Sequence, residues 1–177
     1  MGAIAEALAA LAKADVPLLL IGGNALQAFG YTRATLDVDC LIAVESAERL
    51  KEVLGANGFP WVGGMALFHE FWHHGRKDES PIHAMRVDAT TFGKMWSRSI
   101  PAEISGIPLR VPCLPHLLAL KLFSAKQNPK RHNKDFQDVC ILLQKNPDKI
   151  SREELGQVCQ QYASQEAVNE LRLQGFL

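Results

Sequence analysis

Residues 18–43 change character several times within a short distance, which limits the folds that the chain can adopt. An apolar run ends at Gly22 and Gly23, a short amphipathic stretch follows over residues 24–29, and a second apolar run begins at residue 36. A glycine pair permits backbone conformations that other residues avoid, and it lets the backbone approach a ligand closely. The pattern predicts two buried strands that are joined through a tight turn and a short helix.

Asp37 and Asp39 lie inside the second apolar run. On a strand, residues two apart point to the same face, about 7 Å from each other. Unpaired carboxylates are costly in apolar surroundings, and two on one face repel each other unless a cation lies between them. Mg²⁺ prefers oxygen ligands and keeps a substrate phosphate among them. We favour a metal site here over the alternatives, an ordinary glycine turn and a solvated edge strand.

The order Gly22-Gly23, then Asp37-x-Asp39, with Arg33 leading into the acidic strand, resembles the signature of the nucleotidyltransferase superfamily related to DNA polymerase beta. Within that superfamily the segment is most similar to small bacterial enzymes of abortive-infection and toxin-antitoxin systems. In this family a later strand supplies a third metal carboxylate, and Asp88 fits that position. The alternative for Asp88 is an N-terminal cap on the helix that follows it.

The resemblance implies an α/β (α+β) fold, with a core made of a short mixed sheet flanked by helices and a C-terminal helical extension. It implies a nucleotidyltransferase core over residues 1–112 and a helical subdomain over residues 113–177. The implied reaction transfers a nucleoside monophosphate from an NTP to a hydroxyl acceptor and releases pyrophosphate. Asp37, Asp39 and Asp88 would hold two Mg²⁺ ions, for which Mn²⁺ can substitute.

The same resemblance implies a phosphate-binding set. Backbone N–H groups of Gly22, Gly23 and Asn24 would cradle the triphosphate. Many family members have serine where this chain has Gly23, so Asn24 is the candidate substitute for that hydroxyl. Arg33 or Lys121 would add positive charge in the transition state. The alternative for Lys121, which lies in a predicted apolar helix, is a packed stem with a solvated amine.

A rival motif occurs at His69, Glu70 and His73, which match the H-E-x-x-H pattern of zinc hydrolases. That chemistry requires a helix, but flanking glycines leave little room for one. On a strand the two histidines would lie about 13 Å apart, too far for one ion. We therefore expect a strand with exposed or half-buried histidines, and we keep a zinc hydrolase as the third candidate function.

The composition of the whole chain limits the classes of molecule that it is expected to bind. The 19 basic residues balance the 19 acidic ones, so net charge does not drive nucleic-acid binding. Four scattered cysteines and the lack of a membrane-spanning apolar run favour a reduced, cytoplasmic setting without membrane contact. The acceptor stays open between an RNA end, a protein and a small molecule. The second candidate function is a catalytically inactive nucleotide-binding or toxin-antitoxin partner protein, with a cognate antitoxin as a candidate partner.

Overall fold

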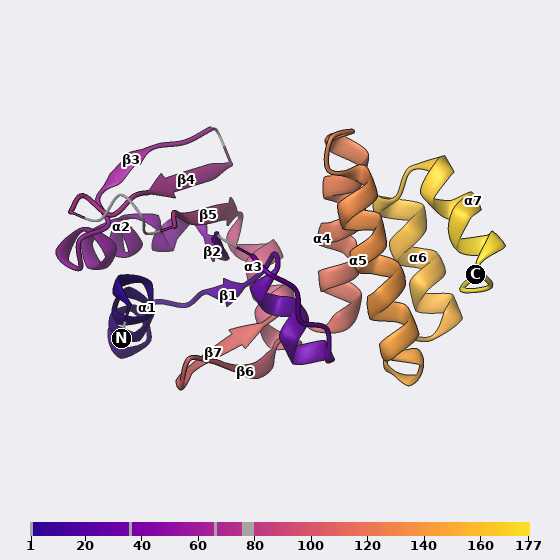
Figure 1. Cartoon of the computed structure of the whole chain (residues 1–177), viewed down its shortest axis with the longest axis horizontal. Coiled ribbons are helices and arrows are strands. Elements are labelled where there is room, and N and C mark those ends of the chain that lie inside the picture. The colour runs from indigo at the N-terminus through magenta and orange to yellow at the C-terminus, as the bar shows by residue number, and fades with distance from the viewer. Residues whose placement is uncertain (1, 36, 66, 76–79) are drawn as a thin grey trace. The chain divides into compact units, whose positions relative to one another are not determined.

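The computed structural model describes residues 2–35, 37–65, 67–75 and 80–177. The chain divides into two compact units (Figure 1). The N-terminal unit comprises Met1–Ala25 and Thr32–Pro112, and the C-terminal unit comprises Leu26–Tyr31 and Cys113–Leu177. The sheet lies in the first unit and the second is helical, so the predicted fold class is confirmed.

The N-terminal unit is built on a five-stranded mixed sheet with the order β1-β2-β5-β4-β3. Its strands are β1 (Leu19–Leu20), β2 (Val38–Ala43), β3 (Trp61–Gly63), β4 (Phe68–Phe71) and β5 (Ile82–Val87). The central strand β2 runs antiparallel to β1 and parallel to β5, while β4 runs antiparallel to both β5 and β3. Five of the six residues of β2 are buried, as expected for a strand covered on both faces.

Helices and a hairpin surround this sheet (Figure 1). They are α1 (Ala3–Lys13), the 3-10 helices η1 (Asn24–Phe29) and η2 (Val44–Ser46), α2 (Ala47–Ala56), α3 (Ala89–Ser97), and the hairpin strands β6 (Ile100–Ile104) and β7 (Ile107–Val111). The apolar face of α1 packs against α2 and β7. The 3-10 helix η1, whose residues belong to both units, forms where a short helix was predicted.

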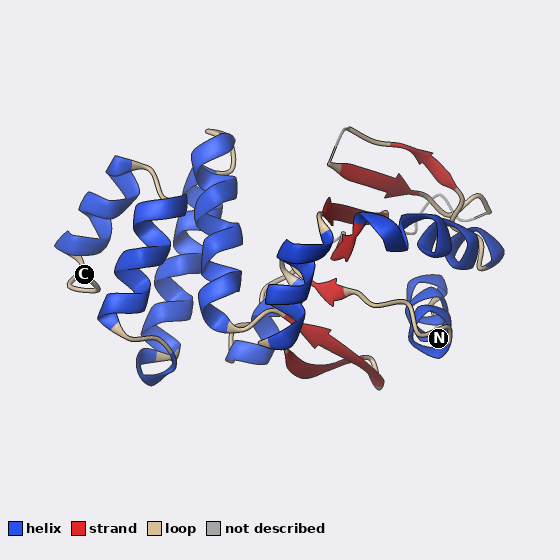
Figure 2. Cartoon of the chain, turned by 180° about the vertical axis from the view of Figure 1, so that it is seen from behind, coloured by secondary structure: helices blue, strands red, loops and turns tan. Residues whose placement is uncertain are grey.

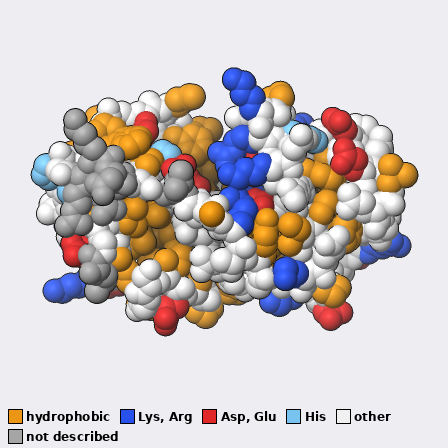
Figure 3. All heavy atoms as spheres, viewed as in Figure 1, with side chains coloured by type: hydrophobic (Ala, Val, Ile, Leu, Met, Phe, Trp, Pro, Cys, Tyr) orange, Lys and Arg blue, Asp and Glu red, His pale blue; other side chains and the backbone are white. Residues whose placement is uncertain are grey.

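The β3–β4 hairpin carries large apolar side chains that remain in solvent, and Figure 3 shows hydrophobic side chains at the surface in this region. They belong to Trp61, Val62, Met65, Leu67 and Phe68, with Trp72 just beyond β4. Because β3 is the last strand of the sheet, apolar surface is concentrated at this edge.

The C-terminal unit consists of packed helices (Figure 2). They are α4 (Leu114–Gln127), α5 (His132–Lys145), the 3-10 helix η3 (Pro147–Lys149), α6 (Arg152–Tyr162) and α7 (Gln165–Leu173). The leucines of α4 pack it against α5 and α6, and the hydroxyls of Ser151 and Ser164 cap α6 and α7 by accepting backbone N–H bonds. None of the helices in the described ranges has both the length and the apolar composition needed to span a bilayer.

Candidate active site

The glycine turn packs directly against the acidic strand. Gly22 has a φ of +63°, and a methyl group placed there would contact the Asp39 carboxylate. A methyl group on Gly23 would lie 2.8 Å from Cβ of Thr35. Both contacts are shorter than real side chains tolerate, and a positive φ is costly for residues with a side chain. The two glycines therefore allow the turn backbone to lie beside the Asp39 side chain.

The residue after the glycines fixes the start of β2. The Asn24 side-chain amide donates a 3.1 Å hydrogen bond to the backbone carbonyl of Asp37, and the Thr35 hydroxyl donates to the same oxygen at 3.4 Å. These three residues line a pocket of about 210 Å³ within the N-terminal unit. Asn24 thus holds Asp37 beside the turn. Arg33 is half-buried, and its guanidinium donates to the Ala34 carbonyl at 3.3 Å.

A row of three polar side chains crosses the sheet from β2 to β4. Asp39 is paired with His83 on β5, and His83 is paired with Glu70 on β4. The imidazole lies between the two carboxylates, with Nδ1 3.5 Å from Oδ1 of Asp39 and Nε2 3.6 Å from Oε1 of Glu70. The sequence predicted neither residue at this site, because Glu70 and His83 were considered only for zinc chemistry. The pairing of distant strands that joins them has no signal in local sequence.

This row attracts positive charge. The hydrogen bond to Asp39 raises the pKa of His83, the charges of Asp39, Asp37 and Glu70 raise it further, and burial opposes the shift. The side chains of Asp39 and His83 are 27% and 28% exposed, so a ligand can reach them. Several carboxylates around one imidazole make this end of the sheet suitable for a cation.

Asp88 lies elsewhere. It follows His83 by five residues on and beyond β5, which at a rise of about 3.3 Å per residue separates the two by roughly 16 Å. Its carboxylate accepts hydrogen bonds from the Thr91 backbone N–H at 2.9 Å and from the Thr91 hydroxyl at 2.6 Å. The hydroxyl bond, followed by the backbone bond, lowers the pKa of Asp88. The structure therefore gives Asp88 the alternative role of helix cap on α3 and does not bring it to Asp37 and Asp39.

Lys121 belongs to the C-terminal unit, where it is 4% exposed. Its amine donates to Oδ1 of Asp135 at 3.0 Å and to Oδ2 of Asp138 at 2.7 Å. The Ser124 hydroxyl donates to the second oxygen of Asp135 at 2.7 Å. Of the alternative considered for Lys121, the packed stem is observed but the solvated amine is not, because the amine joins α4 to α5 through buried ion pairs.

The H-E-x-x-H motif forms no helix. His69 and Glu70 lie on β4 and therefore point to opposite faces, and His69 is 5% exposed beside the rings of Trp61 and Phe71. His73 follows the strand and packs edge-on against Phe59 at 5.0 Å. The predicted strand is confirmed, the expected exposure of His69 is wrong because the ring packs in the core, and the geometry of a helical zinc site is not formed.

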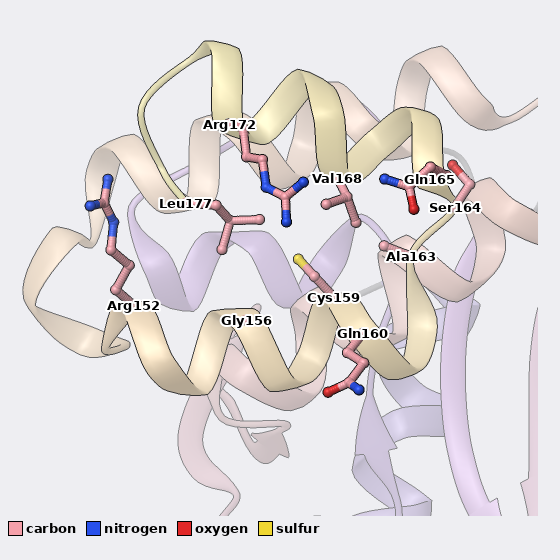
Figure 4. Close-up of a pocket in the computed structure, with 10 residues that line it drawn as sticks. All are labelled: Arg152, Gly156, Cys159, Gln160, Ala163, Ser164, Gln165, Val168, Arg172 and Leu177. Carbon is pink, nitrogen blue, oxygen red and sulfur yellow. The ribbon is translucent and has the colours of Figure 1, made fainter.

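A larger pocket, of about 630 Å³, lies between α6 and α7 in the C-terminal unit. Figure 4 shows Arg172, Cys159 and Leu177 pointing into this space. Burial raises the pKa of the Cys159 thiol to about 11, so the thiol stays protonated at neutral pH and is a poor nucleophile. The pocket shares no residue with the predicted site.

No family model matches the chain, and no curated protein matches it by sequence. Solved structures do. One is a solution structure of the antibiotic-resistance factor ANT(2'')-Ia, with a TM-score of 0.68 and 17% sequence identity. The alignment covers 97% of this chain and 95% of that structure's chain. A crystal structure of ANT(2'')-Ia with adenylyl-2''-tobramycin has a TM-score of 0.67 at 17% identity, covering 90% and 94%. An antigenic nucleotidyltransferase-like protein from Paracoccidioides brasiliensis has a TM-score of 0.55 at 15% identity, covering 90% and 87%. The chain therefore has the fold of the nucleotidyltransferases.

Proposed function

We propose that this protein is a metal-dependent nucleotidyltransferase that transfers a nucleoside monophosphate from an NTP to a hydroxyl acceptor. The observation that carries the proposal is the close packing of the Gly22 turn against the Asp39 carboxylate. In this arrangement, the backbone of a glycine turn, whose N–H groups suit phosphate, stands beside a carboxylate suited to a cation. The nucleotidyltransferase fold of the chain is consistent with this chemistry.

The donor set fits Mg²⁺, with Mn²⁺ as a substitute. Asp37 and Asp39 offer oxygen ligands, and the shifted pKa of His83 reports a negative potential around them. Asp37 and Asp39 would hold the metal, and Glu70, on the far side of His83, would add negative charge near it in place of the predicted Asp88. When bound, the metal would activate the acceptor hydroxyl and neutralise phosphate charge.

The remaining site residues would bind and position. The N–H groups of Gly22 and Gly23 would contact the triphosphate, and Asn24 keeps Asp37 beside them through the 3.1 Å bond. Arg33 remains a candidate for additional phosphate charge. Lys121 is left out of this role, because its amine is already bonded to two aspartates in the other unit.

For the acceptor we propose a small hydroxylated molecule. One similar structure holds adenylyl-2''-tobramycin, and a chain with no net charge lacks the long-range attraction that a large RNA footprint uses. An aminoglycoside is therefore the first acceptor to test, beside an RNA end and a protein. A cognate antitoxin and a cytoplasmic setting remain predictions.

The test begins with nucleotide binding by the full chain. We expect one or more NTPs to raise the melting temperature only with Mg²⁺, because a ligand at 100 times its Kd adds about 2.7 kcal/mol of stability. Asp39→Asn should lose this shift, while Asp148→Asn, a change at an exposed aspartate in the C-terminal unit, should keep it. Labelled NTP is then incubated with the acceptor panel.

No shift with any NTP, or an unchanged shift in Asp39→Asn, would overturn the proposal. Nucleotide binding without transfer to any acceptor would instead support the inactive nucleotide-binding protein.

A further inference from the structure

Three side chains that commonly bind metals converge in the C-terminal unit, outside the proposed nucleotide site. His132 begins α5, and Glu166 and Glu170 lie on successive turns of α7. One ligand atom from each lies within 4.8 Å of the other two. We propose that these three residues bind one divalent transition-metal ion that fastens α7 to α5.

The donor atoms favour this class of metal. An imidazole nitrogen suits zinc, nickel, copper and iron, whereas a site for Mg²⁺ or Ca²⁺ would consist of oxygen ligands alone. Zn²⁺ accepts both histidine and carboxylate ligands, and three protein ligands commonly leave its fourth position to water. Zn²⁺ is therefore the probe of choice.

The histidine ring is held in place. His132 stacks on Phe136, one helical turn later, with ring centroids 5.9 Å apart and planes within 2°. Phe136 is buried, so the imidazole rests on a fixed surface. A ligand whose orientation is already fixed loses less entropy when the metal binds.

The side chains of α5 and α7 also meet further along the two helices. Gln174, one turn beyond Glu170, hydrogen-bonds the Cys140 thiol on α5, and the Glu170 charge acts on the same thiol. Side chains of α7 and of its C-terminal cap therefore reach α5 at two places. A metal bound by His132, Glu166 and Glu170 would link the two helices near their N-terminal ends.

The charges around the site favour a cation. Glu166 and Glu170 stand four residues apart on one helix, where like charges destabilise the helix unless a cation lies between them. A metal ion between the two carboxylates lowers this repulsion.

The test is calorimetric titration of the full-length protein with Zn²⁺ in chelator-treated buffer, with Co²⁺ absorption as a second readout. We expect a single site that raises the melting temperature. His132→Gln should remove it, and Glu170→Gln should weaken it about tenfold or more. The control is Glu153→Gln, which makes the same change at an exposed glutamate of α6 outside the site. Far-UV circular dichroism shows whether each variant is folded, and either variant alone suffices if the other does not fold.

The site is independent of the proposed nucleotide site, so an Asp37→Asn/Asp39→Asn double variant should keep it. Absence of saturable Zn²⁺ binding would overturn the proposal. So would binding that survives in both His132→Gln and Glu170→Gln, or binding that disappears in the double aspartate variant.

Discussion

Each unit of this protein places one basic side chain between carboxylates, but the two clusters differ in burial. In the N-terminal unit, His83 lies 3.5 Å from Asp39 and 3.6 Å from Glu70, and all three side chains are between 27% and 39% exposed. In the C-terminal unit, Lys121 is 4% exposed and bonds two aspartates of α5 at 3.0 and 2.7 Å.

The difference indicates what each cluster can do. The buried lysine has close partners and no solvent-facing side, so it holds α4 to α5 and has little capacity to bind a ligand. The histidine row is looser and open to solvent, so its carboxylates can exchange a partner for a metal ion or a phosphate. Similar residue types thus serve stability in one unit and, as proposed here, binding in the other.

The largest loss of stability is expected from removing the buried lysine that bonds the two aspartates of α5. Lys121→Ala should lower the free energy of unfolding by about 3–5 kcal/mol, because it leaves buried carboxylates without their counter-ion. Urea denaturation measures the loss. The control Lys126→Ala, at an exposed position of the same helix, should stay within about 0.5 kcal/mol. If Lys121→Ala also lost no more than about 0.5 kcal/mol, the buried ion pairs of Lys121 would not stabilise the fold.

A smaller loss of unfolding free energy is expected from adding a methyl group beside Asp39 in the N-terminal unit. Gly22→Ala should cost about 1–3 kcal/mol, because the new methyl group meets Asp39 and the positive φ becomes strained. It should also weaken the Mg²⁺-dependent stabilisation by NTP. Gly93→Ala, an exposed helical glycine with open space around it, should be neutral or stabilising. Unchanged NTP stabilisation in Gly22→Ala would separate the turn from the site.

A still smaller loss of stability is expected from changing Asp88, which lies outside the row formed by Asp39, His83 and Glu70. Asp88→Ala should reduce thermal stability modestly by removing the cap on α3. It should leave NTP stabilisation intact, and Asp88→Asn, which retains a capping side chain, should restore most of the melting temperature. If Asp88→Ala abolished NTP stabilisation, Asp88 would belong to the metal site after all.

The smallest effect is a pH dependence of stability that comes from His69, the residue before Glu70. Desolvation, followed by the charges of Arg86 and Lys51, lowers the pKa of His69 from 6.5. The unfolded chain therefore takes up a proton before the folded one does, so this contribution is fully present above pH 6.5 and is lost as pH falls towards the lower folded pKa.

The difference in unfolding free energy between His69→Leu and wild type should therefore move in favour of the variant from about pH 7 to about pH 5. The control is His74→Gln, at an exposed histidine outside the strand. A difference that stays constant over this range would contradict the assignment. His83, whose pKa is raised, contributes the opposite dependence, since its stabilisation is lost as pH rises through its folded pKa.

The local sequence determined the elements around the turn and half of the candidate site. The apolar runs and the glycine pair predicted β2 and η1, and Asp37 and Asp39 predicted an acidic strand beside the turn. These features depend on backbone preferences and side-chain alternation within a few residues, which a sequence displays directly.

The tertiary structure alone decided which side chains meet across strands and helices. The register of β2, β5 and β4 placed His83 and Glu70 beside Asp39 and moved Asp88 to a helix cap. Packing of α4 against α5 likewise enclosed Lys121. Strand register and helix packing follow from burying apolar surface over the whole unit, and a one-residue change in register would present a different set of side chains to the site.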